Sequence, residues 1–377
     1  MRRSRSFADT AMNFTTARKL VEMHGTPALF VSANRIRRSY RDLAAALPGV
    51  ELFYAVKANA ASELVRILAD EGSSFDISTN GEIDIVRSCG IEPSRCLHTH
   101  PVKSDAEIRY ALDFGIAHFV VDNEDELRKF LPYRDRARLL VRMSIQNPSA
   151  LVNLSHKFGV APQDVFALIE MGRELGLKIA GISFHAGSQN ENALKFIEAL
   201  EYCRDICWRA AAGSEPLSII DIGGGFPINY ITSVLPPAQF CQPVNEYLER
   251  YFANYRVIAE PGRYLCGSAA TLATRVKGRA LRDGGWGYYL DAGLYGSFSG
   301  KVYDHAEYPM SVAARGKRQR SVLAGPTCDS FDVLYENIAL PVLKVGELLL
   351  FDSMGAYTNA SASRFNGFEK AKLVVID

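Results

Sequence analysis

From about residue 50 onward, short apolar runs rich in β-branched residues alternate with longer amphipathic stretches. This alternation restricts the fold, because repeated strand–helix units build a parallel sheet whose faces are covered by helices. The amphipathic stretches include residues 105–114, 162–175 and 193–211. Eight runs have the pattern of strands, at residues 52–56, 74–78, 96–100, 118–122, 139–143, 179–184, 218–222 and 256–259. Eight such units predict an α/β fold of the (β/α)8 TIM-like barrel type rather than an open sheet.

The chain changes character after residue 262, where strand-like segments follow one another without long helices between them. These segments are residues 270–276, 287–291, 320–324, 348–351 and 371–376. A further strand pattern at 28–31 precedes a helical pattern at 36–46, and the proline-containing stretch 233–243 is predicted to be a surface loop. We therefore predict an N-terminal segment at 1–33 that joins the β domain, a barrel at 34–262 and a C-terminal β-rich domain at 263–377.

The charge balance argues against partners that bind through long-range electrostatics. A formal net charge of +1, from 43 basic and 42 acidic residues, gives no field that favours nucleic acid or an anionic membrane. No apolar run approaches the roughly 20 residues of a membrane span, and the basic start lacks the apolar core of a secretory signal. Seven cysteines without zinc-type spacing predict a reducing compartment and no metal site. We expect a cytoplasmic protein that acts on a small molecule.

Lys57 stands at the end of the first predicted barrel strand, where barrel enzymes place their chemistry. A lysine at the end of a buried strand is costly unless it is paired or used covalently, and lysine forms Schiff bases with pyridoxal phosphate. The alternative is a lysine whose ammonium simply reaches solvent.

Polar and glycine-rich clusters follow other predicted strands. Gly223, Gly224 and Gly225 would let backbone N–H groups approach a phosphate, although three glycines after a strand are as often only a tight turn. Ser188 and Arg263 could donate to the same phosphate from neighbouring strand ends.

Two further side chains suit a pyridine ring. Glu260 could keep the nitrogen of a pyridine protonated, or could merely pair with Arg263. His185 has small neighbours that leave room for a ring to stack on it, whereas His98 and His100 are interpreted as structural.

The ordered motifs resemble one enzyme family over most of the chain, from about residue 27 to the C-terminus. They are YAVKAN at 54–59, FD at 75–76, KFG at 157–159, SFHAGS at 183–188, DIGGGF at 221–226, AEPGRY at 259–264, YGSF at 295–298, YDH at 303–305, GPTCD at 325–329, MGAYT at 354–358 and FNGF at 365–368. This series is similar to that of the fold type III, alanine-racemase-like barrel decarboxylases that use pyridoxal 5'-phosphate. Within them the ornithine/lysine/diaminopimelate decarboxylase family is closest.

The resemblance implies a role for each matching residue. Lys57 would carry the cofactor as an imine, Glu260 would pair with the pyridine nitrogen and His185 would stack on the ring. Residues implied to bind the phosphate are Ser188, Gly223, Gly224, Gly225, Arg263 and Tyr357. Residues implied to order the surroundings of the lysine are Asp76, Glu82, Arg142 and Lys157.

The resemblance also implies a homodimer with shared active sites. Cys328 would come from the partner subunit to protonate the product carbon, and Asp329 would meet the distal end of the substrate. Tyr295 is expected on the substrate side as well. Decarboxylation of an L-diamino acid of the ornithine or lysine type, in polyamine biosynthesis, is the implied reaction.

Two departures from the family pattern leave the substrate open. Ala292 stands where ornithine decarboxylases carry an acid that holds the distal ammonium, and the neighbouring Asp291 would face the other side of a strand. Arg364 replaces a small residue and could bind a carboxylate, unless it faces solvent. The alternative substrates are therefore meso-diaminopimelate or a citrylated diamino acid of siderophore biosynthesis. An alanine-racemase-like enzyme or a non-catalytic regulatory relative is disfavoured by Cys328 and by Lys57, respectively.

Overall fold

The computed structural model describes residues 12–147, 157–211, 216–282 and 284–377. They form two compact units. Among the described residues, the β unit comprises those up to Arg35, Asn229–Ser233 and those from Cys266 to Asp377, and the barrel unit comprises those from Ile36 to Ile228 and from Val234 to Leu265.

The barrel unit contains a closed barrel of parallel strands, as predicted. In barrel order the strands are β2 (Val50–Ala55), β3 (Ser74–Ile77), β4 (Cys96–His98), β5 (His118–Val121), β6 (Arg138–Met143), β7 (Ile179–Phe184), β8 (Ile219–Asp221) and β9 (Arg256–Ala259). The barrel closes where β2 pairs in parallel with β9, with Leu52 opposite Ala259. Six strands contribute to one buried cluster inside the barrel, namely Phe53, Leu97, Val120, Leu140, Ile219 and Ile258.

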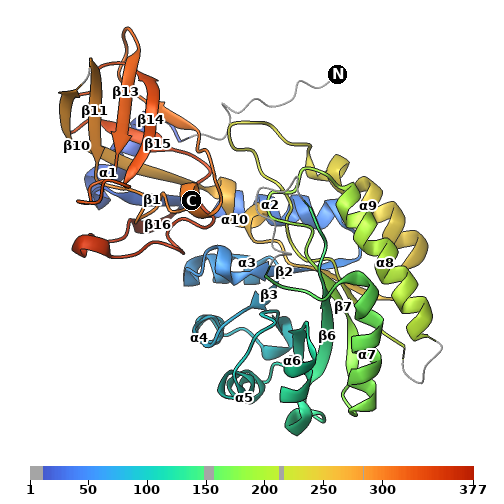
Figure 1. The fold of residues 1–377 in the computed structure, drawn as a ribbon. Coiled ribbons are helices and arrows are strands. Elements are labelled where there is room, and N and C mark those ends of the chain that lie inside the picture. The colour runs from blue at the N-terminus through green and yellow to red at the C-terminus, as the bar shows by residue number, and fades with distance from the viewer. Residues whose placement is uncertain (1–11, 148–156, 212–215, 283) are drawn as a thin grey trace. The chain divides into compact units, whose positions relative to one another are not determined.

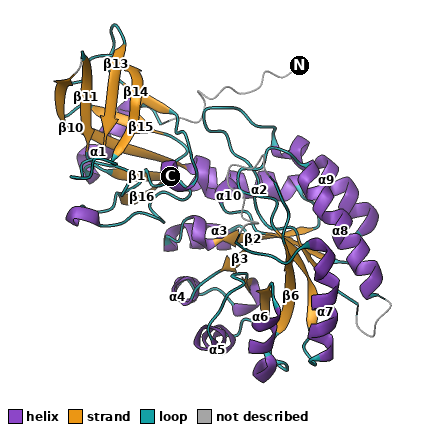
Figure 2. Cartoon of the chain, in the orientation of Figure 1, coloured by secondary structure: helices purple, strands orange, loops and turns teal. Residues whose placement is uncertain are grey.

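Helices cover the outside of these strands, as Figures 1 and 2 show for the helices from α3 to α9. The α-helices are α2 (Ala33–Ala46), α3 (Ser62–Asp70), α4 (Asn80–Ser88), α5 (Asp105–Phe114), α6 (Glu124–Lys129), α7 (Val165–Glu174), α8 (Leu194–Ala210), α9 (Pro237–Tyr251) and α10 (Arg263–Cys266). Short 3₁₀ turns of the barrel unit are η2 (Val56–Ala58), η3 (Pro93–Arg95), η4 (Leu131–Tyr133) and η6 (Pro162–Asp164), whereas η7 (Gly267–Ala269) and the short helix α11 (Gly300–Tyr303) belong to the β unit. Local sequence sets the boundaries: α5 starts in a capping box of Ser104 and Glu107 and stops at Gly115, whose φ of 112° is left-handed.

The stretch 233–243 is not the surface loop that its prolines predict, because α9 begins at Pro237 and contains Pro243. Pro237 suits the first turn of a helix, whereas Pro243 removes an internal hydrogen bond. The helix forms because it buries an apolar stripe, made of Phe240, Cys241, Val244 and Leu248.

The β unit is built on an eight-stranded sheet, so the predicted fold class is confirmed in both parts. Its strands are β1 (Ala28–Ser32), β10 (Ala270–Arg282), β11 (Gly285–Leu290), β12 (Met310–Val312), β13 (Gln319–Ala324), β14 (Val333–Leu340), β15 (Leu348–Phe351) and β16 (Lys372–Ile376). The strand β1 pairs antiparallel with β10 and parallel with β16, so the N-terminal strand is part of this sheet. The helix α1 (Phe14–His24) contributes Ala17 and Val21 to the same core as Phe30, and η8 (Phe365–Gly367) precedes β16.

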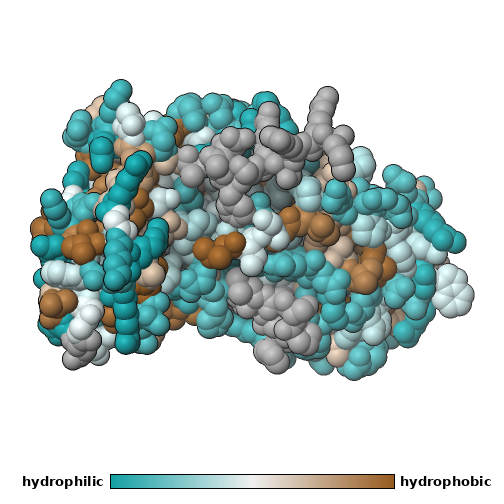
Figure 3. Space-filling model, turned by 90° about the horizontal axis from the view of Figure 1, so that it is seen from above, coloured by the Kyte–Doolittle hydropathy of each residue, from teal (hydrophilic) through white to brown (hydrophobic). Residues whose placement is uncertain are grey.

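Hydrophobic groups on the face drawn in Figure 3 lie in small separate patches within a largely hydrophilic surface. Among the described residues, no helix combines the length and the apolar character needed to cross a membrane.

Candidate active site

Lys57 lies in η2 directly after β2, and its neighbour in the barrel is Asp76 at the end of β3. The Lys57 Nζ is 2.5 Å from Asp76 Oδ2, while the Thr99 hydroxyl donates to Asp76 Oδ1. The Asp76 side chain is fully buried, whereas the Lys57 side chain is 40% exposed. This arrangement fixes the lysine at the strand end and leaves it accessible to a ligand.

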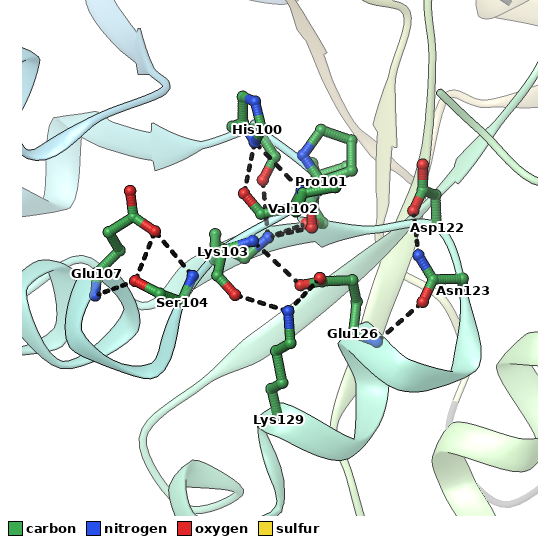
Figure 4. A network of polar contacts seen from close by, with 11 residues as sticks. His100, Pro101, Val102, Lys103, Ser104, Glu107, Asp122, Asn123, Glu126 and Lys129 are labelled. Atoms are coloured by element: carbon green, nitrogen blue, oxygen red, sulfur yellow. Dashed lines mark hydrogen bonds and ion pairs between the residues drawn. The ribbon is translucent and has the colours of Figure 1, made fainter. Parts of the chain in front are cut away.

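The loop that carries Thr99 is held by a buried lysine that the sequence did not single out (Figure 4). Lys103 is 2% exposed, and its Nζ donates to the carbonyls of His100, Pro101 and Val120 at 2.7, 2.8 and 2.7 Å. Burial lowers the pKa of the Lys103 ammonium to about 7. The segment from the end of β4 to the start of α5 is thereby tied to β5.

Two carboxyl groups meet at the ends of β8 and β9. Asp221 accepts hydrogen bonds from Ser183 Oγ at 2.8 Å and from the Gly223 N–H at 2.9 Å. The Glu260 side chain is buried, and its Oε1 has no hydrogen-bond partner among the described residues. Burial and the nearby Asp221 charge raise the pKa of Glu260 well above its usual value. A buried, unsatisfied carboxyl group of this kind calls for a donor or cation from a ligand.

The three glycines after β8 form a turn that admits no larger residue. A Cβ on Gly223, whose φ is +66°, would lie 2.1 Å from the Phe184 carbonyl oxygen. A Cβ on Gly225, at φ +106°, would lie 2.2 Å from the Gly187 carbonyl oxygen, and one on Gly224 would lie 2.6 Å from the Glu260 carbonyl oxygen. The glycines therefore bring the turn against the ends of β7 and β9.

The segment after β7 lies beside this turn. Arg263 is 4% exposed and donates through Nη2 to Ser188 Oγ at 3.0 Å. His185 Nδ1 accepts from the Gly187 N–H at 3.0 Å, and burial lowers the pKa of His185 to about 3, so its ring is neutral. The barrel unit thus brings together the predicted lysine, carboxyl, imidazole and anion-binding groups. Of the two histidines interpreted as structural, His98 stacks on Phe119 in the barrel core.

Glu82, in α4, stands near this site and titrates unusually. Its Oε2 accepts from the Ser78 N–H at 2.6 Å, and burial raises its pKa from 4.5 to about 7, to which the Asp76 charge adds. Protonated Glu82 therefore stabilises the fold fully below about pH 4.5, and this contribution is lost as the pH rises through about 7.

We expect Glu82→Gln to flatten this pH dependence. Since one pKa unit corresponds to about 1.4 kcal/mol, the variant should gain about 2 kcal/mol over the parent protein between pH 5 and pH 8. Chemical denaturation at several pH values measures this difference, with the exposed Glu63→Gln in α3 as control. Parallel pH profiles for the parent and Glu82→Gln would contradict the expectation.

The remaining candidates belong to the β unit. The Tyr295 hydroxyl donates to Asp329 Oδ2, and the Tyr295 ring stacks on Phe365 with centroids 4.4 Å apart. The Cys328 side chain is exposed, and the Cys328 N–H donates to Asn366 Oδ1 at 3.0 Å. The structure therefore brings Cys328, Asp329 and Tyr295 together.

Tyr357 and Arg364 also belong to the β unit. Tyr357 follows β15 with a left-handed φ of 54°. The Arg364 guanidinium is 3.1 Å from Glu369, and both side chains are largely exposed, at 71% and 76%. The role of Arg364 in binding a substrate carboxylate stays a prediction.

Ala292 is buried, and Asp291 does not take the place of the missing acid. The Asp291 carboxylate accepts from Thr26 Oγ1, Thr274 Oγ1 and the Arg275 N–H inside the β unit. These hydrogen bonds connect the end of β11 to β10 and to the residue that precedes the cis proline before β1.

Comparison with known proteins adds four findings. Residues 33–267 match the family described as pyridoxal-dependent decarboxylase, pyridoxal binding domain. A lysine/ornithine decarboxylase of Selenomonas ruminantium is 36% identical over 93% of this chain and 90% of its own length. The crystal structure of a lysine/ornithine decarboxylase from Vibrio vulnificus, complexed with cadaverine, is 45% identical, with a TM-score of 0.92 over 96% of this chain and 98% of that one. An arginine decarboxylase of Paramecium bursaria Chlorella virus, bound to agmatine, is 28% identical, with a TM-score of 0.91 over 96% and 100% of the two chains.

Proposed function

Because this chain belongs to the pyridoxal-dependent decarboxylase family, and is thus a carboxy-lyase that uses pyridoxal phosphate, we propose that its substrates are free lysine and ornithine. The observation that carries the proposal is the Asp329 carboxylate, held by the Tyr295 hydroxyl beside the Cys328 thiol. A carboxylate presented in this way suits the distal ammonium of a diamino acid. The products would be cadaverine and putrescine, which the related Vibrio enzyme binds in its crystal structures.

The residues of the barrel unit fit the cofactor. The unsatisfied Glu260 Oε1 would accept from the protonated pyridine nitrogen, which would give that buried oxygen a hydrogen-bond donor and the carboxylate a positive charge beside it. The glycine turn, Ser188 and Arg263 would hold the phosphate, and the neutral His185 ring would stack on the pyridine. We also propose Tyr357 of the β unit as a phosphate donor, on its resemblance to the family alone.

Lys57, Asp76 and Cys328 would have separate roles in the reaction. Lys57 would bind the cofactor covalently through Nζ, with Asp76 orienting that nitrogen. Bound pyridoxal phosphate supplies a conjugated ring that accepts the electron pair left when the substrate carboxylate departs as carbon dioxide. The Cys328 thiol would then donate its proton to the carbon that lost the carboxylate, and the thiolate would regain a proton from water.

We propose a homodimer in which Cys328 and Asp329 of the partner subunit complete each site. This assembly is consistent with the exposure of Cys328. We place the enzyme in the cytoplasm, because all seven cysteines are free of disulfide bonds. The carboxylated and conjugated substrates are less favoured, since Arg364 pairs with Glu369.

Substrate preference tests the proposal directly. Carbon dioxide release should be measured from ornithine, lysine, arginine, meso-diaminopimelate and citrylated diamino acids, using purified enzyme loaded with cofactor. We expect the highest kcat/KM for lysine and ornithine, because one carboxylate faces one distal ammonium. A preference for a carboxylated substrate would overturn the proposed substrate class and would support Arg364 as the residue that binds the additional carboxylate.

A further inference from the structure

Asp332 lies just before β14 and is almost completely buried, at 2% exposure. Its Oδ1 accepts from the Leu294 N–H at 2.7 Å. Its Oδ2 accepts from the Thr327 N–H at 3.1 Å and from Thr327 Oγ1 at 2.8 Å. One carboxylate therefore joins the turn after β11 to the loop at 325–332, which carries Cys328 and Asp329.

The surroundings of the Asp332 carboxylate are shaped to its size. A Cβ on Gly293 or on Gly325 would lie 2.3 Å from Asp332 Oδ1, so a larger residue at either position would displace the carboxylate. The loop also closes through its backbone, since the Gly325 N–H donates to the Asp332 carbonyl at 2.8 Å and the Asp332 N–H donates to the Asp329 carbonyl at 3.1 Å. Side chain and backbone of this one residue thus fix both ends of the segment 325–329.

The two residues with proposed chemical roles depend on this loop for their position. The Cys328 side chain is exposed, and its backbone N–H is bound to Asn366. Asp329 contacts the Phe331 N–H at 3.0 Å and the Tyr295 hydroxyl. A shift of the loop would move the thiol and the carboxylate together, away from the partners that Asn366 and Tyr295 provide.

We propose that Asp332 is a positioning residue that sets where the Cys328 thiol and the Asp329 carboxylate are presented, a role that rests on the proposed function of those two residues. An asparagine at this position has one acceptor oxygen in place of two, so its amide NH₂ would face either the Leu294 N–H or the Thr327 N–H. That unfavourable contact displaces one of the two joined segments.

The test compares Asp332→Asn with Asp352→Asn in the loaded enzyme. Asp352 is the matched control, because it is a half-buried aspartate of the same unit that accepts from Thr271 Oγ1 at 2.6 Å. Four quantities are measured: the melting temperature, kcat for lysine, KM for lysine, and the rate at which iodoacetamide alkylates Cys328, followed by peptide mass spectrometry.

We expect Asp332→Asn to lower kcat by about 10- to 100-fold and to raise KM severalfold, since small displacements of a reacting group are costly. The alkylation rate of Cys328 should change at least about threefold, because its surroundings change. Asp352→Asn should change the melting temperature while leaving kcat, KM and alkylation close to the parent values. An Asp332→Asn protein that loses thermal stability but keeps all three of these values would overturn the proposal.

A milder variant covers the case in which Asp332→Asn does not fold. Thr327→Val removes only the hydroxyl that donates to Oδ2 and keeps the shape of the side chain. Thr327→Val should change kcat and the alkylation rate of Cys328 in the same direction as Asp332→Asn, but by a smaller factor. Unchanged values would count against the proposal. Alkylation needs no turnover, so it reports the position of Cys328 even if no substrate is decarboxylated. Absence of decarboxylation in the parent enzyme would refute the proposed function and not the positioning role of Asp332.

Discussion

Replacing Lys57 with alanine should abolish decarboxylation, with a loss on the order of a thousandfold or more in kcat. Lys57 is the lysine that stands at a barrel strand end within 2.5 Å of a buried aspartate while keeping a 40% exposed side chain. Without its Nζ the cofactor would have no covalent attachment in the barrel, and the Asp76 carboxylate would lose the ammonium paired with it.

Two measurements check this expectation. Carbon dioxide release reports turnover, and the visible absorbance of covalently linked pyridoxal phosphate reports attachment. Lys178→Ala, at an exposed position before β7, is the control and should retain both signals. Full activity in Lys57→Ala would refute its assignment as the lysine that binds the cofactor.

Mixing two inactive proteins should restore activity if the active sites are shared between subunits. A dimer of one Lys57→Ala chain and one Cys328→Ala chain has one site in which Lys57 and Cys328 are both intact, and one in which both are lost. Random pairing makes half the dimers mixed, so the unseparated mixture should have about a quarter of the parent activity, and the purified mixed dimer about half.

The experiment requires coexpression with two different affinity tags, so that the mixed dimer is purified away from the parental variants. Each variant alone supplies the baseline, and both baselines should be far below the mixed dimer. A purified mixed dimer with no more activity than the two baselines would refute the shared site, although it would leave the role of Lys57 intact.

The barrel could be predicted from the sequence because its strands are buried on both faces. Such strands are short continuous runs of β-branched and aliphatic residues, and the predicted limits of β7 and β9 agree with the structure. The strand-end positions of Lys57, Glu260 and the glycine turn followed from the same pattern. Their chemical roles came from resemblance and remain to be tested.

Elements at the edge of the β unit were harder to predict. β14 lies at the end of the sheet order and pairs with β13. Its buried and exposed residues therefore alternate only weakly. β12 has only three residues, all half-buried. Neither strand has the hydrophobic pattern that burial imposes on a central strand.

Residues that act by fixing others were also missed. Thr99, Lys103 and Asp332 gain their importance from partners such as Asp76, Val120 and Leu294, which lie in other segments of the chain. A single sequence contains no local signal for such pairs. The one available hint for Asp332 is its place three residues after Asp329, in a polar stretch between two strands.

The place of β1 in the sheet has a consequence for the order in which the protein forms on the ribosome. β1 is made first, yet its two neighbours are β10 and β16, and the Ser32 hydroxyl at its end bonds to Asp377, 345 positions later. Loop closure over such a separation is slow, whereas successive barrel strands pair with the next strand in the chain, apart from the closing pair of β2 with β9. The emerging N-terminal strand must therefore stay unpaired, with its apolar residues in need of protection, until the barrel and β10 have been synthesised, and its pairing with β16 waits for the last residues.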